Sequence, residues 1–259
     1  MGIVNVTPDS FSDQGCHAVS EKAIEYAIKL IEDGADLLDI GGESSRPGST
    51  CVNLEEELRR VIPVIEALKS STIPISVDTT KPEVMQASIQ AGASMINDIN
   101  ALRSEGALKI IAESGVMVCL MHMKGMPKTM QDNPLYADVV SEVKCFLQQQ
   151  IRVAQDSGIT DDQLVIDPGF GFGKTLQHNL ALFRSLDQFT TFNVPVMVGI
   201  SRKSMLGTIT GNGVNHRTYA SITAAVLAAA KGVKILRVHD VKATKEAILV
   251  FNALNQDIK

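Results

Sequence analysis

The amino-acid sequence predicts an α/β fold, a single (β/α)8 TIM barrel, on two observations. Short runs rich in β-branched residues alternate with longer amphipathic runs along the chain, and nearly continuous apolar strands between helices are typical of a parallel sheet. Eight such repeats fall within 259 residues, which is the usual size of a closed (β/α)8 barrel. A doubly wound open sheet is the alternative, but that fold usually has fewer strands.

The expected strands are short and begin almost at the first residue. They cover residues 2–6, 35–40, 73–78, 94–99, 116–122, 163–167, 194–200 and 234–239. The expected helices follow them at residues 20–33, 54–70, 81–91, 105–114, 138–157, 176–188, 218–231 and 241–255. No linker composition divides the chain, so a single domain over residues 1–259 is expected.

Helix boundaries carry their own signals. Asn53 is suited to cap the helix that begins "LEEE", whose acidic residues favour a first turn. Pro82 falls in the first turn of the next helix, where its missing N–H costs nothing. Glycines that are suited to a left-handed stop follow five of the helices, at Gly34, Gly92, Gly115, Gly158 and Gly232.

Composition excludes several classes of protein. The net charge of -5 argues against a nucleic-acid or anionic-membrane surface. No apolar run approaches the ~20 residues that cross a bilayer, and the opening "MGIVNVTPDSF" lacks the basic start and apolar region of a signal peptide. The four cysteines have no metal-binding spacing. They are interpreted as free thiols of a protein in the reducing cytoplasm.

In a (β/α)8 barrel, the chemistry lies at the carboxyl ends of the strands. Most of the expected strands end in polar residues: Asn5; Asp39, Glu43, Ser45 and Arg46; Asp78; Asn97 and Asp98; His122; Asp167; Ser201, Arg202 and Lys203; Arg237, His239 and Asp240. Helix caps alone do not require so many polar strand ends. The carboxyl face of the barrel is therefore the expected functional site.

Two groups stand out within this set. Asp78, Asn97 and Asp167 follow the third, fourth and sixth strands, and they suit a flat heterocycle with several N–H donors and a carbonyl. A cationic corner near strands eight, one and two is suited to phosphate. It comprises Ser45, Arg46, Arg237 and His239, with Asn5 beside it as a candidate Mg²⁺ ligand. No His/Cys cluster predicts zinc.

Other assignments stay open. Asp39 and Asp240 are as well explained as caps of the following helices. Lys128 and Lys174 are interpreted as solvated loop charges, and His122 as a core histidine. The long polar loops after the first two strands are expected to be lids over the barrel mouth, with plain surface loops as the alternative.

The stretch "DPGFGFGKT", residues 167–175, resembles a phosphate-binding loop only superficially. A Walker A loop would need glycine where Pro168 stands, and proline has no N–H to donate to a phosphate. The evenly spaced glycines also fail the G-x-G-x-x-G pattern of dinucleotide sites.

Several stretches taken together resemble the bacterial dihydropteroate synthase family of the folate pathway. They are "GIVNVTPDSFSD", "IGGESSRPG", "ISVDTTKPEV", "INDI", "CLMHMKGMPKTMQ", "DPGFGFGK", "GISRKSMLG" and "RVHDV", in order from residue 2 to residue 241. The resemblance implies a TIM-barrel transferase that condenses 6-hydroxymethyl-7,8-dihydropterin pyrophosphate with p-aminobenzoate. The products are 7,8-dihydropteroate and pyrophosphate. It also implies Mg²⁺, sulfonamide inhibitors and a homodimer formed through helices near the C-terminus.

The resemblance implies a role for each matching residue. The pterin pocket is matched by Asp78, Asn97, Met121, Asp167, Phe172, Gly199 and Lys203, and the pyrophosphate and metal corner by Asn5, Ser45, Arg46, Arg237 and His239. The p-aminobenzoate and sulfonamide pocket is matched by Phe11, Ser45, Pro47, Ser201 and Lys203. Catalytic roles fall to Asp78, Lys203, Arg237 and His239.

The chain departs from the family pattern in three places. Ser45 stands where most relatives have threonine, and Asn100 where relatives often have arginine. The usual N-terminal hairpin before the first strand is absent, so a barrel without that floor cover is expected. Competing readings are a methyltetrahydrofolate-binding methyltransferase, which has no use for a pyrophosphate corner, a pterin-binding protein without catalysis, and a variant that excludes sulfonamides.

Overall fold

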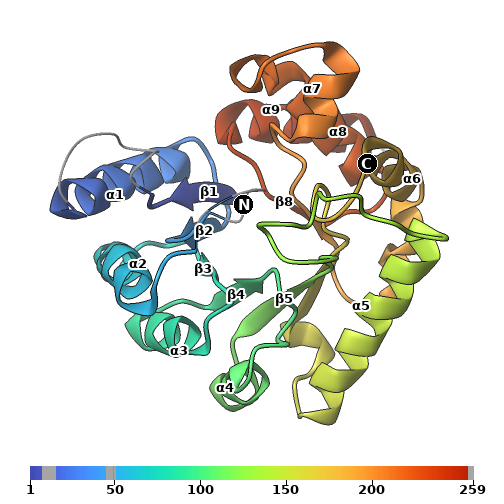
Figure 1. The fold of residues 1–259 in the computed structure, drawn as a ribbon. Coiled ribbons are helices and arrows are strands. Elements are labelled where there is room, and N and C mark those ends of the chain that lie inside the picture. The colour runs from blue at the N-terminus through green and yellow to red at the C-terminus, as the bar shows by residue number, and fades with distance from the viewer. Residues whose placement is uncertain (8–15, 45–48, 50, 256–259) are drawn as a thin grey trace.

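The structure of the protein is a computed structural model that describes residues 1–7, 16–44, 49 and 51–255. Eight parallel strands stand in the centre and helices surround them, as Figure 1 shows in a view along the barrel. The predicted (β/α)8 barrel is confirmed.

Six strands form one continuous sheet in sequence order. They are β1 (Gly2–Asn5), β2 (Leu38–Gly41), β3 (Ile75–Asp78), β4 (Met95–Asp98), β5 (Met117–Met121) and β6 (Leu164–Asp167). The pair β7 (Met197–Val198) and β8 (Ile235–Leu236) completes the ring. Isolated parallel bridges close it, Ile166 to Val196 on one side and Gly2 to Val238 on the other.

The helices lie on the outside of the ring (Figure 1). They are α1 (Cys16–Glu32), α2 (Leu54–Leu68), α3 (Pro82–Ala91), α4 (Ala107–Ser114), α5 (Val139–Asp156), α6 (Leu176–Arg184), α7 (Ser204–Thr210), α8 (Thr218–Ala230) and α9 (Val241–Asn255). The helix boundaries predicted at Asn53 and Gly115 are confirmed. Asn53 accepts a hydrogen bond from the Glu56 N–H at 2.8 Å, and Gly115 ends α4 with φ at 73°.

The structure corrects three details. The strands expected at 194–200 and 234–239 are regular for only two residues each, and the helix expected at 176–188 gives way to short 3-10 turns after Arg184. Helix α7 was not predicted. It is only 7 residues long and contains Gly207, a poor helix former. A Cβ on Gly207 would lie 2.3 Å from the Arg217 guanidinium, so close packing with Arg217 at the start of α8 explains this glycine.

Apolar side chains form three clusters, of which the third, around Met121, lies at the site described below. The larger core lies between the strands and the helices, and it includes Ile40, Val77, Ile96 and Leu147. A smaller cluster of Met95, Cys119, Val165 and Met197 comes from β4 to β7. Packing on both sides of the strands holds the carboxyl ends, and the polar residues there, in fixed positions.

The outer core depends on large side chains such as Leu147 of α5, which is fully buried. We expect Leu147→Ala to lower the free energy of unfolding by about 2–5 kcal/mol, because the substitution leaves a cavity. Gln148→Ala, at the exposed neighbouring position, should change it by less than about 0.5 kcal/mol. Urea unfolding measures both, and equal effects would contradict the packing assigned to α5.

Candidate active site

The predicted pocket residues lie together at the carboxyl ends of the strands. Asp78 ends β3, Asn97 lies in β4, and Asp167 ends β6, with 7%, 3% and 4% of their surfaces exposed. Buried polar side chains are stable only when they have partners or bind a ligand. Their partners therefore define the site.

Arg237, which follows β8, is the central cation of this group. Its Nε donates to Asp39 Oδ2 at 2.6 Å and its Nη2 donates to Asp78 Oδ2 at 2.8 Å. Asp39 also accepts from Ser76 at 2.6 Å and from Asn97 Nδ2 at 3.1 Å. Asp39 is therefore an interior residue of β2 and not a helix cap, and Arg237 joins the predicted phosphate corner to the predicted pocket.

Asn97 leaves one acceptor unused. Its Oδ1 is buried and has no hydrogen-bond partner, although its Nδ2 is held by Asp39. An unpaired buried oxygen costs free energy, commonly about 1–3 kcal/mol. Because the Asp39 contact fixes the orientation of the amide, this oxygen is a preorganised acceptor for an N–H of a ligand.

Burial controls the charges here. It raises the pKa of the Asp78 carboxyl to about 7, against the attraction of Arg237 and with the help of Asp39. Burial alone would lower the pKa of Arg237, but Asp39 and Asp78 together raise it above its ordinary value. Arg237 therefore stays charged, and Asp78 can take up a proton near neutral pH.

Asp167 faces a second cation. Burial raises the pKa of its carboxyl, opposed first by Lys203. Its Oδ1 accepts from the Gly169 N–H at 2.7 Å. Burial lowers the pKa of the Lys203 ammonium to about 8, opposed by the attraction of Asp167. Lys203 donates to the Phe170 carbonyl, so the lysine and the glycine loop after β6 are in contact.

Lys203 and Phe172 form one wall of the site. The Lys203 ammonium lies 4.5 Å from the centre of the Phe172 ring, a cation–π distance. Phe172 packs against an apolar cluster that includes Met121 at the end of β5. Gly199 follows β7, and a Cβ there would lie 3.7 Å from Arg237 Cδ.

The ends of β7 and β8 are tied together. The His239 N–H donates to Ser201 Oγ at 3.2 Å. Arg202 has a left-handed backbone, with φ at 58°, and its guanidinium forms a double hydrogen bond with Asp240 at 2.6 and 3.0 Å. Asp240 thus serves as an ion-pair partner, and the pair fixes the segment that carries Ser201, Lys203 and His239.

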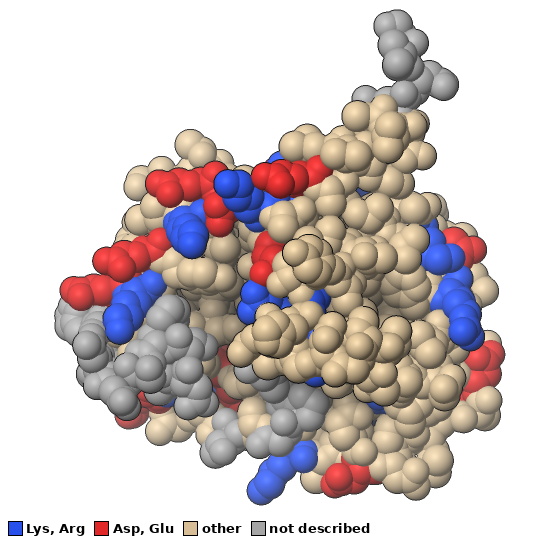
Figure 2. Space-filling view, turned by 90° about the horizontal axis from the view of Figure 1, so that it is seen from above, with Lys and Arg blue, Asp and Glu red and all other residues tan. Residues whose placement is uncertain are grey.

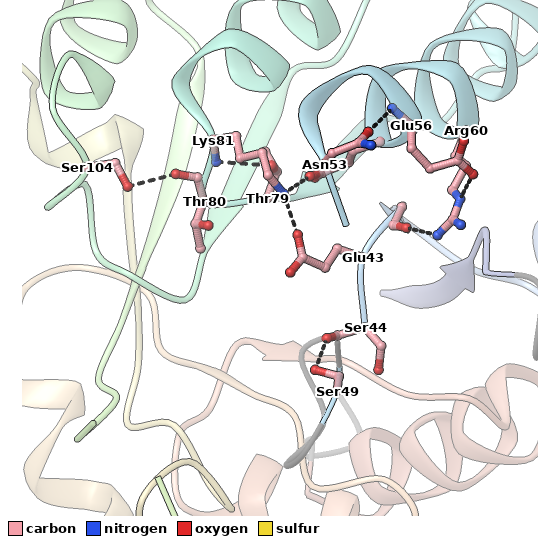
Figure 3. Close-up of polar contacts among 12 residues, drawn as sticks. Glu43, Ser44, Ser49, Asn53, Glu56, Arg60, Thr79, Thr80, Lys81 and Ser104 are labelled. Atoms are coloured by element: carbon pink, nitrogen blue, oxygen red, sulfur yellow. Dashed lines mark hydrogen bonds and ion pairs between the residues drawn. The ribbon is translucent and has the colours of Figure 1, made fainter. Parts of the chain in front are cut away.

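The β2 side of the mouth has its own polar network, drawn in Figure 3. Lys81 bridges Glu43 of the loop after β2 and Glu57 of α2. Arg60 of α2 donates to the Gly42 carbonyl at 2.8 Å. These contacts hold the described start of the loop. Four predicted site residues, Phe11, Ser45, Arg46 and Pro47, lie outside the described residues, as do residues 8–15, 45–48 and 50 of the two loops predicted as lids.

Lys174 and His122 are the next two residues that the sequence analysis interpreted. Lys174, interpreted from the sequence as a solvated loop charge, is only 3% exposed, so that interpretation is wrong. His122, interpreted as a core histidine, is 6% exposed, and its Nδ1 lies 2.9 Å from the Lys174 Nζ. That interpretation is confirmed.

Asn100, which stands where relatives often have arginine, donates from Nδ2 to Ser104 Oγ at 3.2 Å.

The metal prediction rests on Asn5. This residue ends β1, is partly exposed, and its carboxamide makes no hydrogen bond with the described residues. Those residues contain no group of three His, Cys, Asp or Glu side chains that could surround a metal ion. A single free amide oxygen fits a cation such as Mg²⁺, which keeps most of its waters and takes the rest of its ligands from phosphate.

On the face shown in Figure 2, basic and acidic side chains are interspersed among many neutral ones. In the part of the chain that the structure describes, no helix combines the length and apolarity needed to cross a bilayer.

Comparison with known proteins decides the family. Residues 1–239 match the family model described as "Pterin binding enzyme". The chain is 51% identical to the dihydropteroate synthase of Escherichia coli (strain K12), over 98% of this chain and 90% of that protein. The chain belongs to the dihydropteroate synthase family.

Solved structures of the family agree with this assignment. The Xanthomonas albilineans enzyme with 4-aminobenzoic acid is 52% identical, with a TM-score of 0.94 over 99% of this chain and 93% of that one. The Yersinia pestis enzyme with a sulfonamide drug complex is 47% identical, with a TM-score of 0.93 over 98% and 93%. The likeness covers nearly the whole barrel, including every described strand end.

The hydrogen-bond partners of three buried polar side chains could not be predicted from the sequence, because they lie far away along the chain. Asp39, Lys174 and His122 have partners between 37 and 198 positions away. The signal for Asp39 was present: it lies within an expected apolar strand, where a charge is rare without a partner. Lys174 gave no such signal, since a lysine after a glycine loop is usually solvated.

The raised pKa of Asp78 predicts a pH effect on stability. Its pKa in the folded protein, about 7, exceeds the ordinary value of 3.8. The protonated carboxyl therefore favours the folded state below pH 3.8, and this contribution is lost as pH rises through about 7.

We therefore expect the free energy of unfolding of the wild type to fall, relative to Asp78→Asn, between pH 4 and pH 7. The largest slope is about 1.4 kcal/mol per pH unit. Urea unfolding at a series of pH values measures it. Asp132→Asn, at an exposed loop position, should run parallel to the wild type. If the curve of unfolding free energy against pH for Asp78→Asn also ran parallel to that of the wild type, the raised pKa of Asp78 would be refuted.

Proposed function

We propose that this chain is a dihydropteroate synthase that joins 6-hydroxymethyl-7,8-dihydropterin pyrophosphate to p-aminobenzoate. The observation that carries the proposal is the buried, unpaired Asn97 Oδ1, whose amide is held by Asp39, the carboxylate that Arg237 also contacts. A dihydropterin presents several N–H donors and one carbonyl on a flat ring. The site offers the complementary set, two carboxylates, a fixed amide oxygen and a lysine.

In this assignment Asp167, Asn97 and Asp78 bind the polar edge of the pterin. Gly169 occupies only Oδ1 of Asp167, so the second oxygen is left for ring N–H groups. Lys203 donates to the pterin carbonyl or a ring nitrogen. Met121 and Phe172 pack on the ring, and the missing side chain at Gly199 keeps Arg237 accessible.

The reaction forms one C–N bond and breaks one C–O bond. The amine lone pair of p-aminobenzoate attacks the methylene carbon of the pterin, the C–O electron pair leaves with pyrophosphate, and the amine then loses a proton. Electron donation from the ring stabilises positive charge at that carbon, so departure can precede attack. Arg237 and His239 stabilise the leaving charge, and the Asp78 carboxylate offsets the cation. Arg46, outside the described residues, is assigned to the same corner.

Asn5 would hold Mg²⁺, which when bound neutralises part of the pyrophosphate charge.

In this proposal the p-aminobenzoate pocket is formed by Ser201 and Lys203, with Phe11, Ser45 and Pro47. Sulfonamides would compete there. Cys51, Cys119 and Cys145 are free. Free thiols support a location in the reducing cytoplasm.

We also propose a homodimer through the C-terminal helices. Large apolar side chains are exposed on α8 and α9, which lie side by side in Figure 1: Leu227, Leu249, Val250 and Leu254, at 51%, 58%, 59% and 81%. Apolar surface gathered in this way favours an interface with a second copy.

The function is tested by pyrophosphate release. We expect release only when both substrates are present, and inhibition by a sulfonamide. Asp167→Asn should weaken binding of a pterin analogue, measured by calorimetry, by about 1.5–3 kcal/mol, because a charge-assisted contact is lost. Asp156→Asn, on the exposed end of α5, serves as the control. Unchanged affinity in Asp167→Asn would remove that residue from the pocket.

The dimer is tested by sedimentation equilibrium. Val250→Glu places a charge in the proposed interface and should shift the protein towards monomer, because a buried unpaired charge is costly. Val153→Glu makes the same change on α5, where Val153 is 38% exposed, and should leave the mass unchanged. A monomeric wild type would rule the interface out.

A further inference from the structure

Lys174 is the most deeply buried amine in the described part of the barrel, and the reaction as proposed does not use it. Its Nζ lies 2.9 Å from His122 Nδ1 and 2.9 Å from the Gly169 carbonyl oxygen. The Phe172 and His122 carbonyl oxygens lie at 3.1 and 3.3 Å. No carboxylate of the described residues is within ion-pair distance. Four acceptors thus surround a group that has three N–H donors at most.

Burying the Lys174 amine costs free energy, so its position requires an explanation. Removing an ammonium from water is costly, and burial accordingly lowers the pKa of Lys174 well below its ordinary value. Burial, and then the Lys174 charge, lower the pKa of His122 to about 2. The imidazole is therefore neutral at ordinary pH, and its Nδ1 lies within hydrogen-bond distance of the Lys174 amine.

The glycine loop at residues 169–173 sits directly on the segment that follows β5. A Cβ on Gly169 would lie 1.9 Å from the His122 carbonyl oxygen, and a Cβ on Gly173 would lie 2.2 Å from that of Lys124. Tyr136 Oη donates to the Gly173 carbonyl at 2.9 Å. The two loops are thus packed as one unit, with the Lys174 amine at its centre.

This unit carries the proposed pterin contacts. The loop supplies the N–H that orients Asp167, the ring of Phe172, and the Phe170 carbonyl that accepts from Lys203. A shift of the loop would therefore move three groups at once. Displacements of about 1 Å are enough to impair a preorganised site.

We propose that Lys174 is a positioning residue for the pterin pocket: held by His122 Nδ1, its amine fixes the 169–173 loop against β5 and so sets the positions of Asp167, Phe172 and Lys203. This inference rests on the proposed function, because it assigns the pocket to a pterin. A merely structural lysine would lower stability but would leave the affinity of the folded protein for both substrates equally unaffected.

The first test is Lys174→Met in the full chain, which keeps the length of the side chain and removes its donors. We expect the Kd of a pterin analogue, measured by calorimetry, and the KM for the pterin pyrophosphate to rise about tenfold or more, which corresponds to about 1.4 kcal/mol. The KM for p-aminobenzoate should rise less than the KM for the pterin pyrophosphate, because the two proposed pockets share only Lys203 among the three groups that the loop positions. Lys128→Met, at an exposed loop lysine, is the matched control.

The second test uses His122 and does not depend on the folding of the lysine variant. In His122→Asn, the amide oxygen takes the place of Nδ1 and still accepts from Lys174. In His122→Gln, the longer side chain places its amide nearer Nε2. We expect His122→Asn to retain pterin affinity within about threefold and His122→Gln to lose about tenfold or more.

The outcomes separate the two proposals. Pterin binding by the wild type without pyrophosphate release would contradict the proposed function and leave this inference standing. Turnover with an unchanged pterin Kd in folded Lys174→Met, or equal Kd values in the two His122 variants, would overturn the inference alone. A wild type that binds no pterin would overturn both.

Discussion

The double ion pair of Arg237 with Asp39 and Asp78 is the contact on which the barrel mouth depends. It joins residues 198 and 159 positions apart, from the last strand to the second and third. Two buried carboxylates would be unstable without a cation, and a buried guanidinium would be unstable without an anion. The three groups therefore fix one another, and the closure of the barrel brings them together.

The same contact controls what the site can bind. Arg237 and Asn97 donate hydrogen bonds that hold the Asp39 side chain in place, and the amide of Asn97 is left with one oxygen facing no partner. Asp78 is held by a single guanidinium N–H and has a raised pKa. The hydrogen-bond acceptors that remain without a partner are thus concentrated at a few atoms. A ligand with a fixed pattern of N–H donors requires such an arrangement.

The order of the strands and the location of the site could be predicted from the sequence, because both depend on local pattern. Apolar runs, the Asn53 cap and the glycines after helices determine where elements begin and end, and parallel topology brings strand ends such as Asp78 and Asp167 to one face. The partners of buried charges could not be predicted, because they depend on contacts across the barrel. Asp39 and Lys174 belong to this second class, with partners 198 and 52 positions away.

The glycine loop after β6 illustrates why local pattern alone misleads. Its spacing suggests a phosphate cradle, yet three of its N–H groups are already used: Gly169 donates to Asp167, Gly171 donates to Asn179 at 2.8 Å, and Phe172 donates to the Gly169 carbonyl. Three of its carbonyl oxygens accept from lysines, those of Gly169 and Phe172 from Lys174 and that of Phe170 from Lys203. Glycines alternate because each has a positive φ and two lie against backbone atoms of the β5 loop. The loop is therefore built to receive cations on its carbonyl side and to hold a carboxylate with its first N–H, the reverse of what an anion site needs.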